Sequence, residues 1–328
     1  MRFNVFLFIS LIYSCAFSAE KSMILTTNFE NLEVGVASNP AGPTGTTVIH
    51  FPKGAIGAMD MRGGAVAVRE GSSVDENNTW GWLDALVLSG GSTLGLEAAD
   101  GVMSEIIKMR GGQVKFDTIP AVPAAIVYDF TGRKTSTYPD KELGAKAFLA
   151  RQKNKVPYGR VGGGTHVSVG KWFDELKPES SGQGAAYFEK NGIKILVISV
   201  VNAVGNILDK QGNIIRGSLD EKTGERVDIS SRILEKLEST PIQGNTTITA
   251  VITNVKFDRL ELKRIATMAH TSMAQVISPF HTPWDGDVLF SISTRELEKP
   301  AKFEAANAGV IASDLLKTAV WRAVGNEE

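Results

Sequence analysis

The sequence predicts an α/β protein that folds as one domain. Short apolar and β-branched runs alternate with stretches of helical periodicity, which is typical of sheets covered by helices. No linker-like segment or internal repeat divides the chain. Its 328 residues, 43% of them apolar and 22% charged, are enough to bury an extensive core.

The expected elements follow in chain order. Residues 83–88 are a short apolar run that ends in Ser-Gly-Gly, and residues 94–109 have helical spacing. Residues 121–130 and 193–201 are apolar enough to be buried strands, and residues 247–253 alternate β-branched side chains as a further strand does. A helix is expected over residues 256–277, with one apolar face formed by Leu260, Ile265, Met268, Ala269, Met273 and Val276.

Residues 209–243 are polar, glycine-bearing and highly charged. This composition predicts an exposed connection, which would gain mobility if the chain were cut at its end.

Residues 1–19 have the order of a secretory signal peptide. Arg2 gives a positive start, residues 5–13 are apolar, and small residues precede an expected cut after Ser18 or Ala19. The apolar stretch is shorter than the ~20 residues that a membrane-spanning helix needs. We therefore expect a periplasmic or secreted protein without stable membrane association. Cys15, the only cysteine, lies in this segment, so a disulfide is not expected; a lipid anchor there is a minor alternative, because the match to a lipoprotein signal is poor.

Charge and histidine spacing exclude other classes of protein. With 35 basic and 36 acidic side chains, no strong field favours nucleic acid as a partner. The four histidines are His50, His166, His270 and His281. Their spacing is not that of metal ligands, so no metal is expected. A serine triad that uses one of them is not excluded by spacing, although a Gly-x-Ser-x-Gly elbow is absent.

The junction Gly244-Asn245-Thr246 is the most informative feature. A flexible Gly-Asn pair leads into two threonines that open a strand-like run, so a hydroxyl is held at the start of a rigid element. If the bond between Asn245 and Thr246 broke, Thr246 would carry a nucleophilic hydroxyl and a free α-amine, whose pKa near ~8 suits a general base. A simple turn before a strand explains the same residues without chemistry.

Seven blocks, in order from about residue 54 to residue 294, resemble the L-aminopeptidase/D-esterase family. They lie at residues 63–66, 88–103, 120–125, 159–171, 201–205, 244–247 and 285–287. This family includes β-peptidyl aminopeptidases and the nylon-oligomer endo-hydrolase, which are N-terminal-nucleophile hydrolases that mature by self-cleavage. The resemblance implies a four-layer α-β-β-α sandwich and a homo-oligomer, tetrameric or larger. The single domain, residues 20–328, would be cut into a large fragment, 20–245, and a small one, 246–328.

The resemblance also implies the nucleophile and its charged neighbours. Thr246 would attack the carbonyl of Asn245 in the precursor, by an N-to-O acyl shift, and the substrate carbonyl in the mature enzyme. Asp285 and Asp287, one residue apart, would project to one side of a strand and orient the amine and hydroxyl of Thr246. Lys171 would depress the pKa of the α-amine. Taken singly, an Asp-Gly-Asp turn and a surface lysine are the ordinary explanations of these residues.

Two further site residues come from the same resemblance. Asn202 lies in an apolar strand, where its amide must have partners, and it would donate a hydrogen bond near the nucleophile or the oxyanion. A structural asparagine is the equal alternative. Tyr128 would donate to the tetrahedral oxyanion, a contribution of ~3 kcal/mol for a strong donor. A tyrosine of the core is its alternative.

We therefore expect an amide hydrolase that needs no cofactor and acts on a peptide or small amide through an acyl-threonine. The carboxylate pair could meet a substrate ammonium, as in an aminopeptidase, or be occupied by Thr246, as in an endo-amidase. One rival is an acyltransferase of the ornithine-acetyltransferase type. The other is a secreted binding protein that has lost the chemistry.

Overall fold

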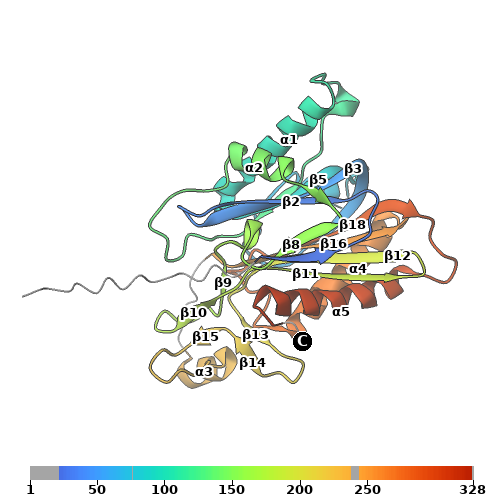
Figure 1. Cartoon of the computed structure of the whole chain (residues 1–328). Helices are drawn as coiled ribbons and strands as arrows, with labels where there is room; N and C mark the ends of the chain where they lie inside the picture. The colour runs from blue at the N-terminus through green and yellow to red at the C-terminus, as the bar shows by residue number, and fades with distance from the viewer. Residues whose placement is uncertain (1–21, 76, 238–243, 327–328) are drawn as a thin grey trace, which may run out of the picture.

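The computed structural model describes residues 22–75, 77–237 and 244–326 (Figure 1). Ten strands form the main sheet, in the order β11-β12-β16-β18-β3-β5-β6-β4, and β2 joins β3 to β7. These strands are β2 (Glu33–Asn39), β3 (Thr44–Met61), β4 (Val68–Arg69), β5 (Trp82–Ser89), β6 (Ala124–Ile126), β7 (Gln152–Lys153), β11 (Gln183–Lys190), β12 (Ile193–Asn202), β16 (Thr246–Val255) and β18 (Val288–Leu297).

Short strands form three smaller sheets. They are β1 (Met23–Thr26) with β8 (Lys155–Tyr158); β9 (Ser168–Val169), β10 (Lys177–Ser180) and β15 (Ser218–Leu219); and β13 (Asn206–Leu208), β14 (Ile214–Arg216) and β17 (Ile277–Ser278). The α-helices in the described ranges are α1 (Ala98–Met109), α2 (Lys141–Leu149), α3 (Ile229–Lys236), α4 (Arg259–Ser272) and α5 (Ala305–Ala323).

The main sheet bends through β3, whose first half pairs with β2 and β5 and whose second half pairs with β18. Side chains of β16 alternate between two cores. Ile248, Ala250 and Ile252 pack into a central core with apolar residues of β5, and Val251 and Val255 pack against α4 and α5. On the far side of β5, a third core lies under α1 and α2. Helices thus cover both sides of the folded sheet (Figure 1). The predicted α/β class is confirmed.

Several elements differ in extent from the sequence prediction. A 3₁₀ helix occupies Ser92–Glu97, so α1 begins only at Ala98. Of residues 121–130 only β6 forms a strand, because Pro120 and Pro123 lack the backbone donors that a longer strand needs. Asp258 caps α4 by accepting a hydrogen bond from the backbone of Glu261, and the helix ends at Ser272.

One expectation was wrong. Leu260 was expected on the apolar face of the helix, but it lies in the first turn of α4 and is 74% exposed. The described part of the connection over residues 209–243 is mostly exposed, as expected, and it also contains β14, β15 and α3. Residues 238–243, like the expected signal peptide and Cys15, lie outside the described residues. Among the helices that are described, none is long and apolar enough to span a membrane.

Candidate active site

Three chain segments meet at the start of β16. Thr246 is its first residue and lies opposite Asn202, the last residue of β12. On its other side β16 runs parallel to β18, and Asn245 forms an isolated parallel bridge with Asp285. All four residues are buried. The neighbouring strands therefore bring together the residues that the sequence placed far apart.

The bond between Asn245 and Thr246 is held in a specific geometry. The Thr246 hydroxyl donates a hydrogen bond to the carbonyl oxygen of Asn245. The same oxygen accepts a hydrogen bond from the backbone N–H of Gly286 at 2.8 Å. A donor on this oxygen stabilises the negative charge that develops when the carbonyl carbon is attacked.

Gly244 must be glycine for two reasons. Its φ of 89° lies in the left-handed region, and a Cβ would lie 2.5 Å from carbon atoms of the Tyr128 ring. The Tyr128 carbonyl accepts a hydrogen bond from the Asn202 side-chain amide at 2.9 Å, and the Gly244 carbonyl accepts one from the same amide at 3.2 Å. Tyr128 thus contacts the junction through its ring and its backbone.

Asn202 connects the junction with Lys171. Its side-chain oxygen accepts hydrogen bonds from the Lys171 ammonium at 2.7 Å and from the Ser168 backbone at 3.2 Å. Lys171 is 1% exposed, and burial lowers its pKa to about 7, against the opposing effect of the Asp285 charge. Lys171 is therefore a buried amine that exchanges a proton near neutral pH, not a surface residue.

Asp285 is fully buried and accepts hydrogen bonds from Thr282 and Val204. The Thr282 hydroxyl is 2.6 Å away, and the backbone N–H groups of Thr282 and Val204 are both at 3.2 Å. Burial, together with the charge of Asp287, raises the pKa of Asp285 to about 6. The two carboxylates are thus close enough to interact, as the sequence predicted, and Asp285 can gain or lose a proton near neutral pH.

Asp287 is also fully buried, and it contacts the residue that follows the nucleophile. One carboxylate oxygen accepts a hydrogen bond from the backbone of Thr247 at 2.7 Å. The other accepts from the backbone and the ring Nδ1 of His281, at 3.2 and 3.0 Å. Both aspartates are fully buried and lie just before β18, so the alternative of an ordinary solvated Asp-Gly-Asp turn is wrong.

Glycine also allows the end of β3 to reach this segment. A Cβ on Gly63 would lie 2.3 Å from the carbonyl oxygen of Asp285 and from the backbone nitrogen of Asp287. The backbone N–H of Ala65 donates to that same carbonyl oxygen at 2.8 Å. The block at residues 63–66 therefore fixes the carboxylate pair from the side opposite β16.

A polar cavity of about 220 Å³ opens beside the junction. Tyr128 and Asn202 line it, together with Asp129, Thr131, Arg160, His166, Val167, Ser168, Pro178 and Ser180. Because it reaches Tyr128 and Asn202, this cavity is a space beside the site that a substrate could enter. Within the described ranges, acidic, histidine and cysteine side chains form no group of three that could hold a metal ion.

Sequence reasoning did not find Gly286, Thr282 or His281 as site residues. All three lie within seven residues of Asp287, in the run His281-Thr282-Pro283-Trp284-Asp285-Gly286-Asp287. The density of polar side chains before an apolar strand was the available signal. The backbone donation by Gly286 left no signal in the side-chain pattern.

The folded sheet with helices on both sides matches the N-terminal-nucleophile hydrolase type of fold. The model of peptidase family S58 matches residues 26–326, and the chain belongs to this family. It is therefore an amide hydrolase, and the resemblance to the L-aminopeptidase/D-esterase family is confirmed.

Relatives and solved structures agree with this assignment. The chain is 39% identical to a 6-aminohexanoate-oligomer endohydrolase of a Kocuria species, over 91% of this chain and 85% of the relative. It is 32% identical to an uncharacterized aminopeptidase of Mycobacterium tuberculosis, over 91% and 86%.

Two solved structures share the fold at 16% identity. The L-aminopeptidase D-Ala-esterase/amidase of Ochrobactrum anthropi, described as a variant of the Ntn-hydrolase fold, has a TM-score of 0.65 and covers 90% of this chain and 84% of its own. The β-aminopeptidase of a Burkholderia species has a TM-score of 0.63, with coverage of 89% and 84%.

Proposed function

We propose that this chain cuts itself between Asn245 and Thr246 and then hydrolyses amide bonds through an acyl-threonine. The observation that carries the proposal is the contact of the Thr246 hydroxyl with the Asn245 carbonyl, whose oxygen also accepts from Gly286. A nucleophile already beside a polarised carbonyl needs little reorganisation before attack.

In self-cleavage, the hydroxyl oxygen of Thr246 attacks the carbonyl carbon of Asn245. The negative charge develops on the oxygen that the Gly286 N–H contacts. We assign the acceptance of the hydroxyl proton to neutral Lys171, which contacts Asn202 opposite Thr246, or to ionised Asp285, which precedes Gly286. Burial brings the pKa values of both groups near neutrality. When the C–N bond breaks, the nitrogen takes a proton and becomes the α-amine of Thr246. Water then hydrolyses the ester and leaves a carboxylate on Asn245.

In turnover, the freed α-amine serves as the general base for its own hydroxyl. Asp287 is already bonded to Thr247 and lies where an anion can orient the new ammonium group. Asn202, once Gly244 is displaced, can donate to the substrate from the same position. Acyl transfer to Thr246 releases the amine product, and water regenerates the enzyme.

We infer that the substrate is a linear amide cut at an internal bond. Both site carboxylates already accept hydrogen bonds from the chain: Asp285 from Val204 and Thr282, and Asp287 from Thr247 and His281. Both carboxylates are fully buried and already hold donors of the chain itself, which favours an endo-amidase over an aminopeptidase. The 39% identity to a 6-aminohexanoate-oligomer endohydrolase supports the same substrate class.

The two fragments would remain one domain after the cut. The small fragment supplies β16 and β18, which lie between β12 and β3 of the large fragment.

We also propose a homo-oligomer that is exported. The Trp80 and Phe116 side chains are 62% and 81% exposed and their rings are 5.8 Å apart, and such an apolar surface favours association with a second copy. The apolar stretch over residues 5–13 supports export to the periplasm.

The proposal is tested by fragment analysis and a matched substrate panel. Purified wild-type protein should give two fragments, the smaller beginning at Thr246, and Thr246→Ala should remain one inactive chain. A linear 6-aminohexanoate oligomer and its N-acetylated form should be cut at similar rates, since an endo-amidase does not need the ammonium. Exclusive cutting of the free-amine form would indicate an aminopeptidase, and product formation only with an added amine acceptor would indicate an acyltransferase. An active wild-type enzyme that stays uncut would refute the self-cleavage.

A further inference from the structure

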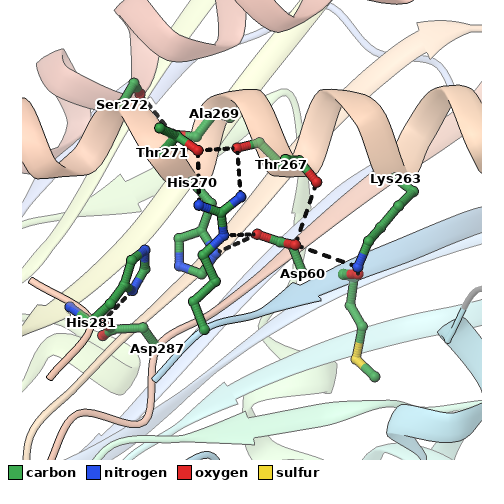
Figure 2. A network of polar contacts seen from close by, with 11 residues as sticks. Asp60, Lys263, Thr267, Ala269, His270, Thr271, Ser272, His281 and Asp287 are labelled. Carbon is green, nitrogen blue, oxygen red and sulfur yellow. Dashed lines mark hydrogen bonds and ion pairs between the residues drawn. The ribbon is translucent and has the colours of Figure 1, made fainter. Parts of the chain in front are cut away.

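Two histidines that the sequence leaves unassigned connect Asp287 with a second carboxylate, Asp60. Figure 2 shows this network between the end of β3, helix α4 and the segment before β18. His281 contacts Asp287, the rings of His281 and His270 are 4.4 Å apart between centroids, and His270 Nδ1 lies 3.1 Å from the Asp60 carboxylate. The network therefore ends at the residue that holds the backbone of Thr247.

His281 contacts the Asp287 carboxylate through two of its groups. Its backbone N–H and its ring Nδ1 both reach the same oxygen, and the other oxygen of Asp287 accepts the Thr247 N–H. We assign the proton of this contact to Nδ1 of the His281 ring, because a carboxylate oxygen is an acceptor. These three donors leave Asp287 a single orientation relative to the start of β16.

The backbone of His281 is in an unusual conformation. Its φ is 59°, in the left-handed region, which is uncommon in residues other than glycine. This conformation allows the backbone and the ring of one residue to face the same carboxylate oxygen. A structural turn alone would be formed more readily with glycine or asparagine.

His270 and Asp60 support His281 from behind. The His270 side chain is buried and its ring is nearly perpendicular to that of His281, at 86°. The Phe280 ring packs on both, with centroid distances of 3.9 Å to His281 and 5.9 Å to His270. Asp60 is held by Arg62 at 2.6 Å and Lys263 at 3.4 Å. The support is thus a charged cluster anchored on β3 and α4.

We propose that His281 is a positioning residue of the reaction: its ring N–H holds the Asp287 carboxylate in the orientation that aligns Thr246, and His270 and Asp60 keep the His281 ring in place. This inference rests on the self-cleavage proposed above, because the rate of that cut is its direct readout. Loss of the donor should misalign the nucleophile while the strands around it stay paired.

The chain offers a matched set of variants at residue 281. His281→Gly removes the ring but tolerates positive φ and keeps the backbone donor to Asp287. His281→Asn also tolerates positive φ, and its side-chain amide can replace the Nδ1 donor. His281→Asp has the shape of asparagine but lacks a donor when ionised. We expect the small fragment to form at least tenfold more slowly in the Gly and Asp variants, and within about threefold of the wild-type rate in the Asn variant.

The controls separate positioning from folding. Each substitution is repeated in the uncut Thr246→Ala chain, where similar melting temperatures would show that the fold is kept. His50→Asn replaces a buried histidine that bonds Glu33 outside the network, and it should process at the wild-type rate. If wild type cuts and the Gly and Asp variants cut as fast, or if Asn is as slow as Asp, the role of His281 is refuted and the proposed function stands. If wild type does not cut, the proposed function itself fails.

Discussion

The Lys171 ammonium donates to both oxygens of Asn202, at 2.7 Å to the side chain and 2.9 Å to the backbone carbonyl. Because Asn202 lies opposite Thr246 and its amide reaches the Gly244 carbonyl, this contact couples a buried amine to both sides of the proposed cut. Lys171 therefore fixes the direction in which the Asn202 amide points and provides a proton carrier at the same place.

Lys171→Met should slow self-cleavage by about 10² or more, equivalent to ~3 kcal/mol in the transition state. Methionine keeps the length of the side chain but loses the donor and the proton acceptor. Since burial lowers the pKa of Lys171 to about 7, the wild-type rate should rise with pH up to about pH 7 and then level off. The variant should lack this rise. Fragment formation, followed by gel from pH 5.5 to 8.5, measures both effects, and an unchanged rate profile would exclude Lys171 as a proton carrier.

Asp287→Asn should abolish processing while the chain stays folded. The substitution keeps shape and volume but removes the charge, and one of its atoms becomes a donor facing the donors of Thr247 and His281. A fall in the rate of at least about 10² is expected. Asp84→Asn is the control, because Asp84 is a buried carboxylate that bonds Arg110 and the backbone of Ala121 away from the junction. Equal processing by both variants would show that the Asp287 charge is not needed.

The sequence predicted the parts of the site that depend on strand pattern. The β-branched alternation after Thr246 and the apolar run before Asn202 were sufficient to place both residues on strands, and β12 and β16 pair as neighbours. The helix pattern failed at Leu260, because capping by Asp258 places that residue in the first turn, where its side chain faces solvent. Local sequence patterns do not show how a helix is placed and rotated relative to the sheet on which it packs.

The network of His281, His270 and Asp60 could not be predicted from local sequence patterns, because its residues come together only in the folded chain. His270 and Asp60 are 210 residues apart, and only the packing of α4 on β3 brings them together. His281 reaches Asp287 because its backbone adopts a left-handed conformation that histidine spacing does not reveal. The four histidines are indeed scattered in the sequence, yet two of them are in contact.

The leader prediction concerns the N-terminal segment. Full-length protein made in a Gram-negative host should be recovered from the periplasmic fraction, and its N-terminus should lie near Ala19 or Glu20, because residues 5–13 form a short apolar stretch followed by small residues. N-terminal sequencing of the large fragment measures this. Retention of Met1 in a cytoplasmic product would contradict it.

Gly244→Ala should block processing far more than an equivalent change elsewhere. The new Cβ would require a left-handed alanine and would lie 2.5 Å from the Tyr128 ring, so the junction must shift. Gly212→Ala is the matched control: its φ is 86°, but a Cβ there meets no atom within 4 Å. Both variants carry the same backbone strain. Only Gly244→Ala should therefore slow fragment formation, and equal slowing would assign the effect to strain alone.

Asp285→Asn should stabilise the uncut chain more at pH 7.5 than at pH 4. Burial raises the pKa of Asp285 to about 6, above the ~3.9 of an unfolded aspartate, so folding favours the protonated form. The contribution of the Asp285 carboxyl to stability is fully present below pH 4 and is lost as pH rises through about 6. This rise in pKa corresponds to at most about 3 kcal/mol of folding free energy, a loss that a neutral asparagine would not show.

Urea unfolding in the Thr246→Ala background measures this effect without interference from self-cleavage. The stability difference between the Asn variant and its parent should grow in favour of Asn between pH 4 and pH 7.5. Asp60→Asn provides a control of opposite sign. Burial alone would raise the pKa of Asp60, but hydrogen bonds from His270 and Arg62 outweigh it and hold the pKa well below the ordinary value. The Asp60 contribution is present above about pH 4 and is lost as pH falls, so Asp60→Asn should be most harmful at pH 7.5. The contrary result is a difference in the free energy of unfolding between Asp285→Asn and its parent that is the same at all pH values. In that case ionisation of Asp285 would not destabilise the fold, and the proposed role of Asp285 as a proton acceptor near neutral pH would be refuted.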